Sequence, residues 1–271
     1  MPAGSTQPNP PSPQWALRLA LSLSQRLSAS RRQPDQGLTL IEGLVAIIVI
    51  AVTIVSITPP IFWATGTRVQ NRKVEQASQI AQGEIDRVRA IVERGGYTLN
   101  QLPPVPFGTA QEDIIRGTTI RAPNAPTATL ISSKPLCNTN TETAPTNYQQ
   151  YIPIDTDNPP NEPANVCKPE FLVQTFRSLG VDSNGNPATG LATPEGFVMG
   201  VRVYASVAEA ELRANRGEIR QASLKGTSGL GGQRLRPLAV QYSTIVRSIA
   251  SQNLSIYRKL CPASAATTGQ C

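Results

Sequence analysis

The feature that most constrains this 271-residue chain is an uncharged stretch that runs from Gly43 to Thr67, directly after the single carboxylate of Glu42. The most apolar part of this stretch ends at Ile57, and together with the residues just before the stretch it forms a segment from Leu38 to Ile57. Twenty residues rise about 30 Å as a helix, which matches the hydrocarbon core of a bilayer. The many β-branched residues do not argue against a helix, because in lipid every backbone polar group must be satisfied internally. An acid in such a segment costs about 2.5–3.5 kcal/mol on insertion scales, so Glu42 is predicted to have a function.

The residues around Glu42 form a motif: Gly37-Leu38-Thr39-Leu40-Ile41-Glu42, followed by the apolar run. This motif closely resembles the N-terminus of type IV prepilins and pseudopilins. In that family a prepilin peptidase cuts after the glycine and N-methylates the next residue, here Gly37 and Leu38. The resemblance implies that Glu42, as the fifth mature residue, pairs with the N-terminal amine of a neighbouring subunit. Such a pair recovers much of the cost of charge in low dielectric, so it would set the register between subunits.

A second match to the family is Pro59, the twenty-second residue counted from Leu38, where pilins often carry a kinking proline. Proline removes a helical N–H and clashes with the preceding turn. Pro60 follows directly, so we expect the pair to open the helix more than one proline does. Two departures are small: Leu38 stands where phenylalanine is commoner, and the leader is longer than the family's shortest type. The resemblance is specific over residues 36–60 and only general beyond about residue 95.

Three simpler classes of N-terminal signal fit these residues less well. A secretory signal has a small-residue cleavage site after its apolar core, but here Ile57-Thr58-Pro59-Pro60 follows instead. Ser30-Arg31-Arg32 suggests a twin-arginine signal, yet Gln33-Pro34-Asp35 is a poor continuation. A plain signal anchor stays open, although it would not need Gly37 and Glu42 at this spacing. The sequence therefore favours the prepilin interpretation.

Charge alone does not determine the membrane topology. The chain carries a net charge of +7, of which the segment before Leu38 supplies +3 and the remainder +4. Leader arginines favour a cytoplasmic N-terminus by the positive-inside rule. Basic residues just beyond the apolar run nearly balance them: Arg68, Arg72 and Lys73. We therefore let the cleavage motif decide, with the leader inside and the C-terminal domain outside the cytoplasm. The modest excess of positive charge is compatible with an acidic polysaccharide or DNA, but it identifies neither.

Cysteine usage agrees with an exported domain. All four cysteines lie beyond the apolar run, at positions 137, 167, 261 and 271. An even count outside the cytoplasm predicts two disulfides, although four cysteines allow three connectivities and four free thiols stay the alternative. We favour pairing sequence neighbours, Cys137 with Cys167 and Cys261 with Cys271. The second pair would close a C-terminal loop, as pilins often do. None of the spacings is typical of a zinc site.

The pattern after the prolines is typical of an amphipathic helix. Apolar residues recur at spacings of three and four, and Gly95-Gly96 supplies the stop; they are Val74, Ala77, Ala81, Ile85, Val88 and Val92. With the family resemblance this predicts an α+β, pilin-like lollipop, in which one long helix packs on a small antiparallel sheet. The expected order is a leader (1–37), a transmembrane half-helix (38–58), an amphipathic half-helix (59–96), a Pro/Thr/Asn-rich variable surface region (97–169), and a β-sheet head with a C-terminal disulfide loop (170–271).

Three segments read clearly as strands: Glu170–Arg177, Phe197–Ala205 and Leu238–Arg247. In the second, alternation places Phe197, Met199, Val201 and Val203 on one face, and in the third it groups Leu238, Val240, Tyr242 and Val246. Asp113–Arg121 and Tyr151-Ile152 are weaker candidates. Ser206 to Glu209 has the form of a capping box, which predicts a short helix that ends near Gly217. Gly226–Gly232 is expected to be a flexible loop.

Residues that would support catalysis are scarce. The chain has no histidine, which removes the commonest general base and metal ligand, and it has no phosphate-binding Walker loop. Asp182-Ser183-Asn184-Gly185-Asn186 does not fit a calcium loop and is expected to be a tight turn. Asp155 and Asp157 form a similar weak pair. Three tyrosines could stack on sugars or bases but are more often packing residues: Tyr148, Tyr151 and Tyr204. We expect no catalytic residues, no metal and no cofactor.

The function expected from the resemblance is that of a minor pilin or pseudopilin, a subunit of a type IV pilus or type II-like secretion filament. Its partners would be prepilin peptidase, other pilins, the inner-membrane assembly platform and the membrane. The strands around Arg236 to Ser248 look similar to those of hormogonium polysaccharide secretion pseudopilins, which implies polysaccharide export. The alternatives are a pilus-tip binding module for adhesion or DNA uptake and, less in keeping with the missing histidines, a membrane-anchored exported enzyme. The expected location is the inner membrane and then the pilus or periplasmic pseudopilus.

Overall fold

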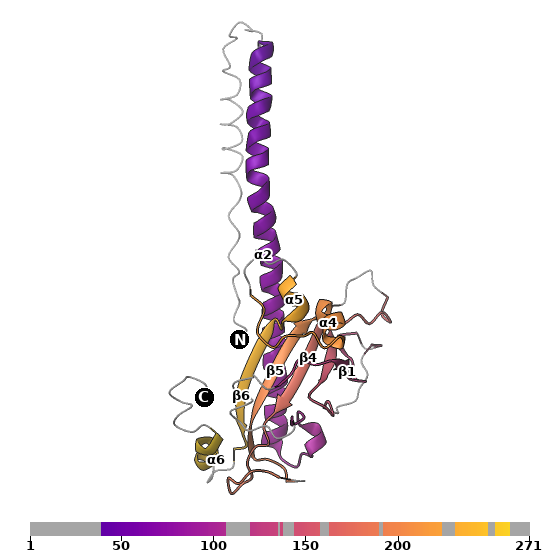
Figure 1. The fold of residues 1–271 in the computed structure, drawn as a ribbon, viewed down its shortest axis with the longest axis vertical. Coiled ribbons are helices and arrows are strands. Elements are labelled where there is room, and N and C mark those ends of the chain that lie inside the picture. The colour runs from indigo at the N-terminus through magenta and orange to yellow at the C-terminus, as the bar shows by residue number, and fades with distance from the viewer. Residues whose placement is uncertain are drawn as a thin grey trace, which may run out of the picture. The chain divides into compact units, whose positions relative to one another are not determined.

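The computed structural model describes residues 39–106, 120–134, 136–137, 144–157, 163–189, 192–223, 231–248 and 253–260, without the side chains of residues 58–65, 67, 231 and 253. The chain divides after Pro59 into two compact units. The first holds an apolar helical segment, and the second is a mixed α/β unit built on one mainly antiparallel sheet (Figure 1). These elements are compatible with the expected α+β class.

Helix α2 runs from Leu40 to Arg94. It begins where the carbonyl of Thr39 accepts the backbone N–H groups of Glu42 and Gly43 at 2.9 and 3.1 Å. Within the first unit the large apolar side chains between Leu40 and Ile57 are all more than half exposed. The helical assignment continues through Pro59 and Pro60, whose side chains lie outside the described part. The predicted kink there stays a prediction.

In the second unit, α2 presents its apolar stripe to the sheet, as the sequence pattern predicts. Ala77, Ala81, Ile85, Val88 and Val92 are each at most 2% exposed and belong to one core with residues of the sheet. A polar contact accompanies them, since the Gln241 side-chain amide donates to the Ser78 hydroxyl at 2.9 Å.

The helix stops at the predicted Gly95-Gly96 pair. Both residues have the left-handed backbone that glycine tolerates, with φ of 71° and 68°. A Cβ at Gly95 would lie 2.3 Å from the guanidinium of Arg247. Gly95 therefore both ends the helix and leaves room for an arginine that forms an ion pair with Glu195 at 3.2 Å.

The sheet has the strand order β1-β3-β4-β5-β6, and β2 also pairs with β3. The strands β3, β4, β5 and β6 are successive antiparallel neighbours, whereas β1 and β2 both run parallel to β3. The strands span Ala125–Pro126 (β1), Ile131–Ser132 (β2), Gln150–Asp155 (β3), Phe171–Arg177 (β4), Gly196–Ala205 (β5) and Ala239–Val246 (β6).

The face of β5 that packs against α2 carries Phe197, Met199, Val201 and Val203, which confirms the predicted alternation. The prediction for β6 is wrong at Leu238. That residue precedes the strand and is buried on the α2 side, whereas Tyr242 contacts Phe176 edge-to-face on the opposite side, with ring centroids 6.4 Å apart. Alternation holds only inside a strand, so the residue before it need not follow the same parity.

The opposite face of the sheet is covered by short elements. These are η2 (Ser206–Ala208) and α4 (Glu209–Arg213), whose Ala208 and Leu212 lie in a buried cluster with Tyr151, Leu172 and Tyr204. The chain also forms η1 (Leu99–Gln101), α5 (Gly231–Leu235) and α6 (Asn253–Leu260). The predicted helix after β5 is present, but the capping box is wrong. No side-chain hydrogen bond caps η2 or α4, because their N-cap residues are Ala205 and Ala208, which carry no side-chain acceptor. Glu209 instead accepts from Tyr151 and Arg213. Of the expected loop Gly226–Gly232, the described Gly231 and Gly232 begin α5 instead.

The region 97–169 contributes more to the sheet than a surface region would. It supplies β1, β2 and β3, and Tyr151 and Ile152 of β3 are 1% and 6% exposed. The candidate strand Asp113–Arg121 lies mostly outside the described residues, and its described end, Ile120-Arg121, is not in a strand. The region is therefore part of the core on one edge of the sheet.

Candidate functional sites

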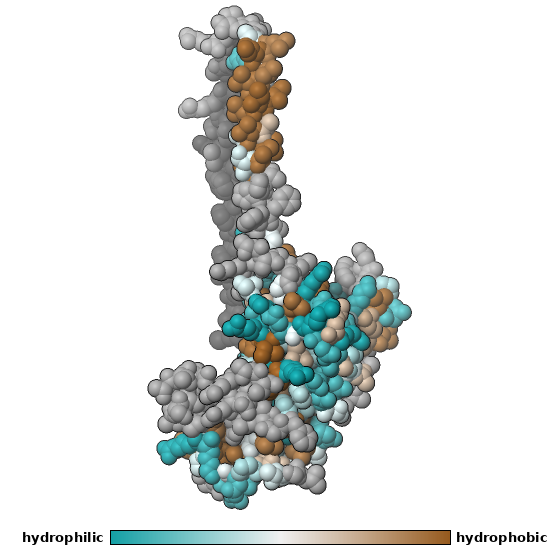
Figure 2. All heavy atoms as spheres, in the orientation of Figure 1, coloured by the Kyte–Doolittle hydropathy of each residue, from teal (hydrophilic) through white to brown (hydrophobic). Residues whose placement is uncertain are grey.

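The first candidate site is the apolar segment of α2. Leu40–Ile57 is long and apolar enough to cross a membrane, and none of it is buried inside the protein. Figure 2 shows its described side chains as a nearly continuous hydrophobic surface. Glu42 is the only ionisable residue in this segment and lies exposed in the first turn of the helix. A carboxylate is favoured there because the helix dipole places positive potential at the N-terminus.

Hydroxyl groups in the segment are satisfied by the helix itself. Thr53 donates to the carbonyl of Ile50 and Ser56 to that of Val52, both at 2.7 Å. Bonds of this kind allow a hydroxyl to enter lipid without an unsatisfied polar group. Glu42 is thus the one ionisable side chain of Leu40–Ile57, and it has no hydrogen-bond or ion-pair partner among the described residues. Gly37 and Leu38, where the sequence predicts processing, lie outside the described residues.

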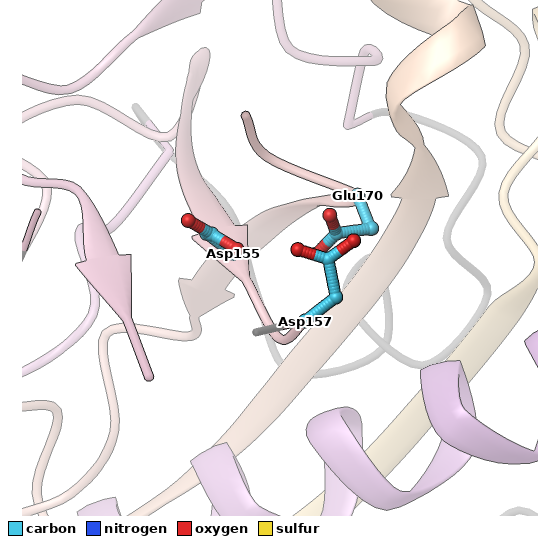
Figure 3. A group of neighbouring side chains, drawn as sticks. All are labelled: Asp155, Asp157 and Glu170. Carbon is cyan, nitrogen blue, oxygen red and sulfur yellow. The ribbon is translucent and has the colours of Figure 1, made fainter. Parts of the chain in front are cut away.

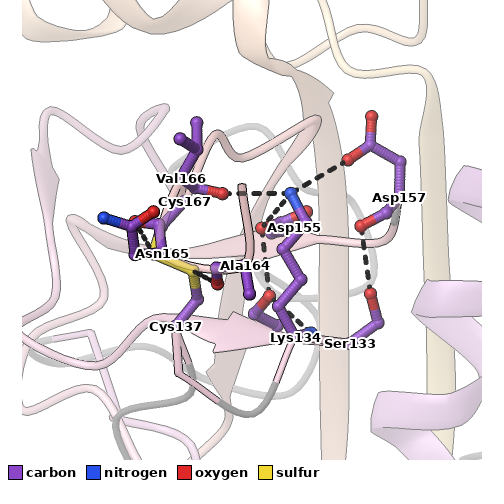
Figure 4. The surroundings of a disulfide bond; sticks show 10 residues. Ser133, Lys134, Cys137, Asp155, Asp157, Ala164, Asn165, Val166 and Cys167 are labelled. Carbon is purple, nitrogen blue, oxygen red and sulfur yellow. Dashed lines mark hydrogen bonds and ion pairs between the residues drawn. A yellow bond between two sulfur atoms is a disulfide. The ribbon is translucent and has the colours of Figure 1, made fainter. Parts of the chain in front are cut away.

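The second candidate site surrounds a disulfide. Cys137 and Cys167 are bonded, with Cα atoms 5.5 Å apart, which confirms the first predicted pair. Cys261 and Cys271 lie outside the described residues, so the second pair stays a prediction. The bond joins the segment after β2 to the segment before β4. It lies beside a group of charged side chains (Figure 4).

A buried lysine is central to this charged group. Lys134 is 1% exposed, and its Nζ donates to the carbonyl of Val166 at 3.0 Å. The same nitrogen lies 3.7 Å from a carboxylate oxygen of Asp155 and 3.6 Å from one of Asp157. Asp155 is also buried and accepts a hydrogen bond from Ser132 at 3.0 Å. Because an unpaired buried charge is strongly unfavourable, Lys134 and Asp155 require each other, whereas Asp157 is half exposed.

Glu170 completes the acidic side of the cluster. Its Oε2 accepts hydrogen bonds from the backbone N–H of Thr156 at 2.6 Å and from its hydroxyl at 3.1 Å. Burial, followed by the charges of Asp157 and Asp155, raises the pKa of Glu170 above 4.5, while the bonds from Thr156 oppose this shift. Figure 3 shows the Glu170 and Asp157 carboxylates close together. The sequence pattern indicates Asp155 and Asp157 but gives no signal for Lys134 or Glu170.

This cluster has the composition of a cation site. One oxygen from each of Asp155, Asp157 and Glu170 lies within 4.8 Å of the others, and carboxylate oxygens are the ligands of hard divalent cations. However, the Lys134 ammonium already lies against two of the three carboxylates. A bound cation would have to displace that ammonium or be repelled by it. We therefore assign the cluster to the structure of the β2–β3 edge.

The remaining residues singled out in the sequence have structural roles. Asp182 accepts the backbone N–H groups of Asn184 and Asn186 at 2.9 and 2.8 Å, which confirms the tight turn. Lys259 donates to the carbonyl of Gly185 in that turn at 2.8 Å.

The tyrosines agree with the packing interpretation. Tyr151 and Tyr204 are buried, and their hydroxyls donate to the Glu209 carboxylate and the Glu218 carbonyl. Burial and the Glu209 carboxylate raise the pKa of Tyr151 to about 12. Tyr148 packs against a small cluster that contains Phe176. Tyr151 and Tyr204 are therefore packing residues that are not exposed for stacking on a ligand.

Comparison with known proteins adds no assignment. No protein-family model matches the sequence, and no curated protein or solved structure is significantly similar to this chain.

Proposed function

We propose that this chain is a non-enzymatic subunit of a type IV pilin-like filament, a minor pilin or pseudopilin. The observation that carries the proposal is the first segment of α2: an apolar span, Leu40–Ile57, with no part buried in its own chain and a single carboxylate in its first turn. The segment directly follows the prepilin motif Gly37-Leu38-Thr39-Leu40-Ile41-Glu42. A helix of this kind needs an apolar environment, which a bilayer and then a filament core would supply in turn.

In this proposal the two parts of α2 have different partners. Residues from Val74 to Val92 are committed to the head, because they are buried against the sheet. The span before Pro59 is available to lipid first and to neighbouring subunits after leader removal. Glu42 would pair with the methylated amine of a neighbour, which is the arrangement in which its charge costs least. The disulfide Cys137–Cys167 supports a head that lies outside the cytoplasm.

The mass of the N-terminal peptide, measured on protein recovered from membranes, tests the proposal. We expect a peptide that begins at N-methylated Leu38, and a Gly37→Arg variant should retain its leader. An intact leader in the unmodified protein, or cleavage beyond Trp63, would contradict the pilin assignment and leave a signal-anchored or secreted protein.

A second test separates processing from assembly. Glu42→Gln should be cleaved normally, yet it should be lost from the sheared filament fraction because the buried charge pair cannot form. Glu75→Gln is the matched control, since Glu75 is exposed on the same helix but lies beyond the apolar span. Equal incorporation of both variants would refute the role of Glu42. The subfamily proposal, polysaccharide export, is tested by deleting the gene, and unchanged export would count against it.

A further inference from the structure

An open pocket lies on the face of the sheet opposite α2. It is separate from the charged cluster described above, because no residue of that cluster lines it. Its volume is about 400 Å³. Two chain segments far apart in sequence form its walls, Ile120–Pro123 on one side and Asn215–Arg220 on the other, and Gln149 completes the lining. Figure 2 shows hydrophilic residues gathered over the neighbouring region of α4 and α5. Neither the apolar span nor the predicted processing site contributes to this pocket.

The first wall is fixed from below by buried side chains. Arg202, which is fully buried, donates from Nη1 to the carbonyl of Ile120 at 2.7 Å. Gln174, also fully buried, donates from its amide to the carbonyl of Arg121 at 2.9 Å. Ala122 packs on the cluster that contains Tyr204 and Leu212. Two strands of the sheet thus hold this irregular segment in place by its backbone.

The second wall is held by hydrogen bonds and by an ion pair of Glu218. The carbonyl of Glu218 accepts from the Tyr204 hydroxyl at 3.0 Å, its N–H donates to Leu235, and its carboxylate binds Arg236 at 2.7 Å. The side-chain amide of Asn124 donates to that of Asn215 at 2.9 Å and so joins the two walls.

Gly217 lets the walls approach each other closely. A Cβ there would lie 2.4 Å from Leu212 and 2.8 Å from Ala122. The pocket is therefore preformed, and a ligand would not have to order it, which lowers the cost of binding.

The pocket rim is positively charged. Arg121 and Arg220 are both exposed there, and among the described residues neither guanidinium has an ion-pair partner. The one carboxylate in the lining, Glu218, is already neutralised by Arg236. Arg202 adds a further positive charge behind the first wall. An anionic group entering the pocket meets two available guanidiniums, each able to bind a carboxylate through two parallel hydrogen bonds.

We propose that this pocket binds an anionic saccharide unit, such as a uronic acid residue of an acidic glycan. The arginine guanidiniums take its carboxylate, and the amides of Gln149 and Asn215 take its hydroxyl groups. The volume is far larger than an inorganic anion needs and falls at the lower end of the range for small-molecule sites. Apolar side chains in the lining, Ile120, Pro123 and Ile219, offer a surface to the C–H face of a sugar ring.

Nucleic acid fits the lining less well. Single strands are held by aromatic side chains on which bases stack, and by a groove that tracks the backbone. The lining residues include no aromatic side chain. The proposal concerns the head alone, so it does not depend on processing at Gly37 or on filament assembly.

The experiment uses the full chain in nanodiscs of zwitterionic lipid, so that neither anionic lipid nor a sugar-based detergent competes. Tetragalacturonate is titrated by calorimetry, with maltotetraose as the uncharged saccharide and a single-stranded oligonucleotide as the non-saccharide polyanion. We expect saturable binding of tetragalacturonate alone. Arg121→Gln and Arg220→Gln should each weaken it about tenfold, as expected for the loss of one charge-assisted pair.

Arg258→Gln is the matched control, because Arg258 is an exposed arginine on α6, outside the pocket lining. It should leave the affinity unchanged. Equal weakening by all three substitutions would reduce the effect to general electrostatic attraction and overturn the proposal. Binding of the oligonucleotide with the same affinity, or no saturable binding of tetragalacturonate, would overturn it as well. A Gln149→Ala variant that binds tetragalacturonate with full affinity would contradict the proposed contact between the Gln149 amide and the saccharide hydroxyl groups.

Discussion

The division of α2 between two environments can be tested with one substitution at two positions. Ile85 is 2% exposed and lies in the core between α2 and the sheet, whereas Ile47 is 70% exposed in the apolar span. Both residues belong to the same helix. Ile→Ala removes the same atoms and changes the helix propensity by the same amount at either site. Any difference in the stability of the head therefore reports packing alone.

The expected magnitudes differ strongly. Burial of three carbon atoms contributes about 2.4 kcal/mol at Ile85, and the cavity left behind brings the cost of Ile85→Ala to about 3–4 kcal/mol. For a unit the size of the head this lowers Tm by roughly 6–16 °C. Ile47→Ala should change the head by less than about 0.5 kcal/mol, because an exposed side chain loses no packing.

The assay is thermal unfolding of the full chain in a non-ionic detergent, followed by near-ultraviolet circular dichroism of the tyrosines. These residues lie in the second unit, most of them in or near the sheet, so the signal reports tertiary structure of the head. Equal shifts for the two variants would refute the reasoning. A larger shift for Ile47→Ala would show that the apolar span, and not residues 74–92, packs on the sheet.

Three further outcomes follow from the same structure. Replacing both Cys137 and Cys167 by serine should lower the free energy of unfolding of the head by about 3.5 kcal/mol, since the disulfide closes a loop with a sequence separation of 30. An unchanged Tm of the double variant would contradict this. Because the pKa of Glu170 is raised in the folded head, the native state loses stability as pH rises from 4.5 through that higher value. Glu170→Gln should therefore stabilise the head at neutral pH and lose this advantage below about pH 4, as urea titrations at both pH values would show. Gly95→Ala should destabilise the head by about 1–2 kcal/mol, because Gly95 has a positive φ. Gly83 lies in open space on the same helix, so Gly83→Ala should stabilise it by about 0.5–1 kcal/mol. Shifts of the same sign in the unfolding free energy of both variants would refute the argument.

Much of the second unit could be predicted because its signals are local. The stripe from Val74 to Val92 repeats at helical spacing, and β4, β5 and β6 alternate or run apolar over seven to ten residues. β1 and β2 escaped prediction because two-residue strands leave no period to detect. Pro153 lies inside β3 and weakens the pattern there.

The charged sites could not be predicted, because their partners are distant in sequence. Asp155 is buried only because Lys134, twenty-one positions earlier, supplies the opposite charge. Arg202 alternates with apolar residues and so looks solvent-facing, yet it is fully buried under the segment that begins at Ile120. The walls of the pocket come from segments almost a hundred residues apart. No local sequence pattern predicts contacts between such distant segments, since these contacts depend on the topology of the whole sheet.

The shared core of α2 and the sheet also affects how the protein is made. One face of β5 shares its core with the α2 residues between Val74 and Val92, so before the helix docks Phe197, Met199, Val201 and Val203 form an apolar band that is open to water on that side. β5 begins about a hundred residues after the end of α2, so the apolar stripe of the helix is synthesised well before this strand. We therefore expect both apolar surfaces to be prone to aggregation until they meet. A shortened protein intended for solution work should therefore begin before Val74, because removal of the whole helix would leave an aggregation-prone sheet.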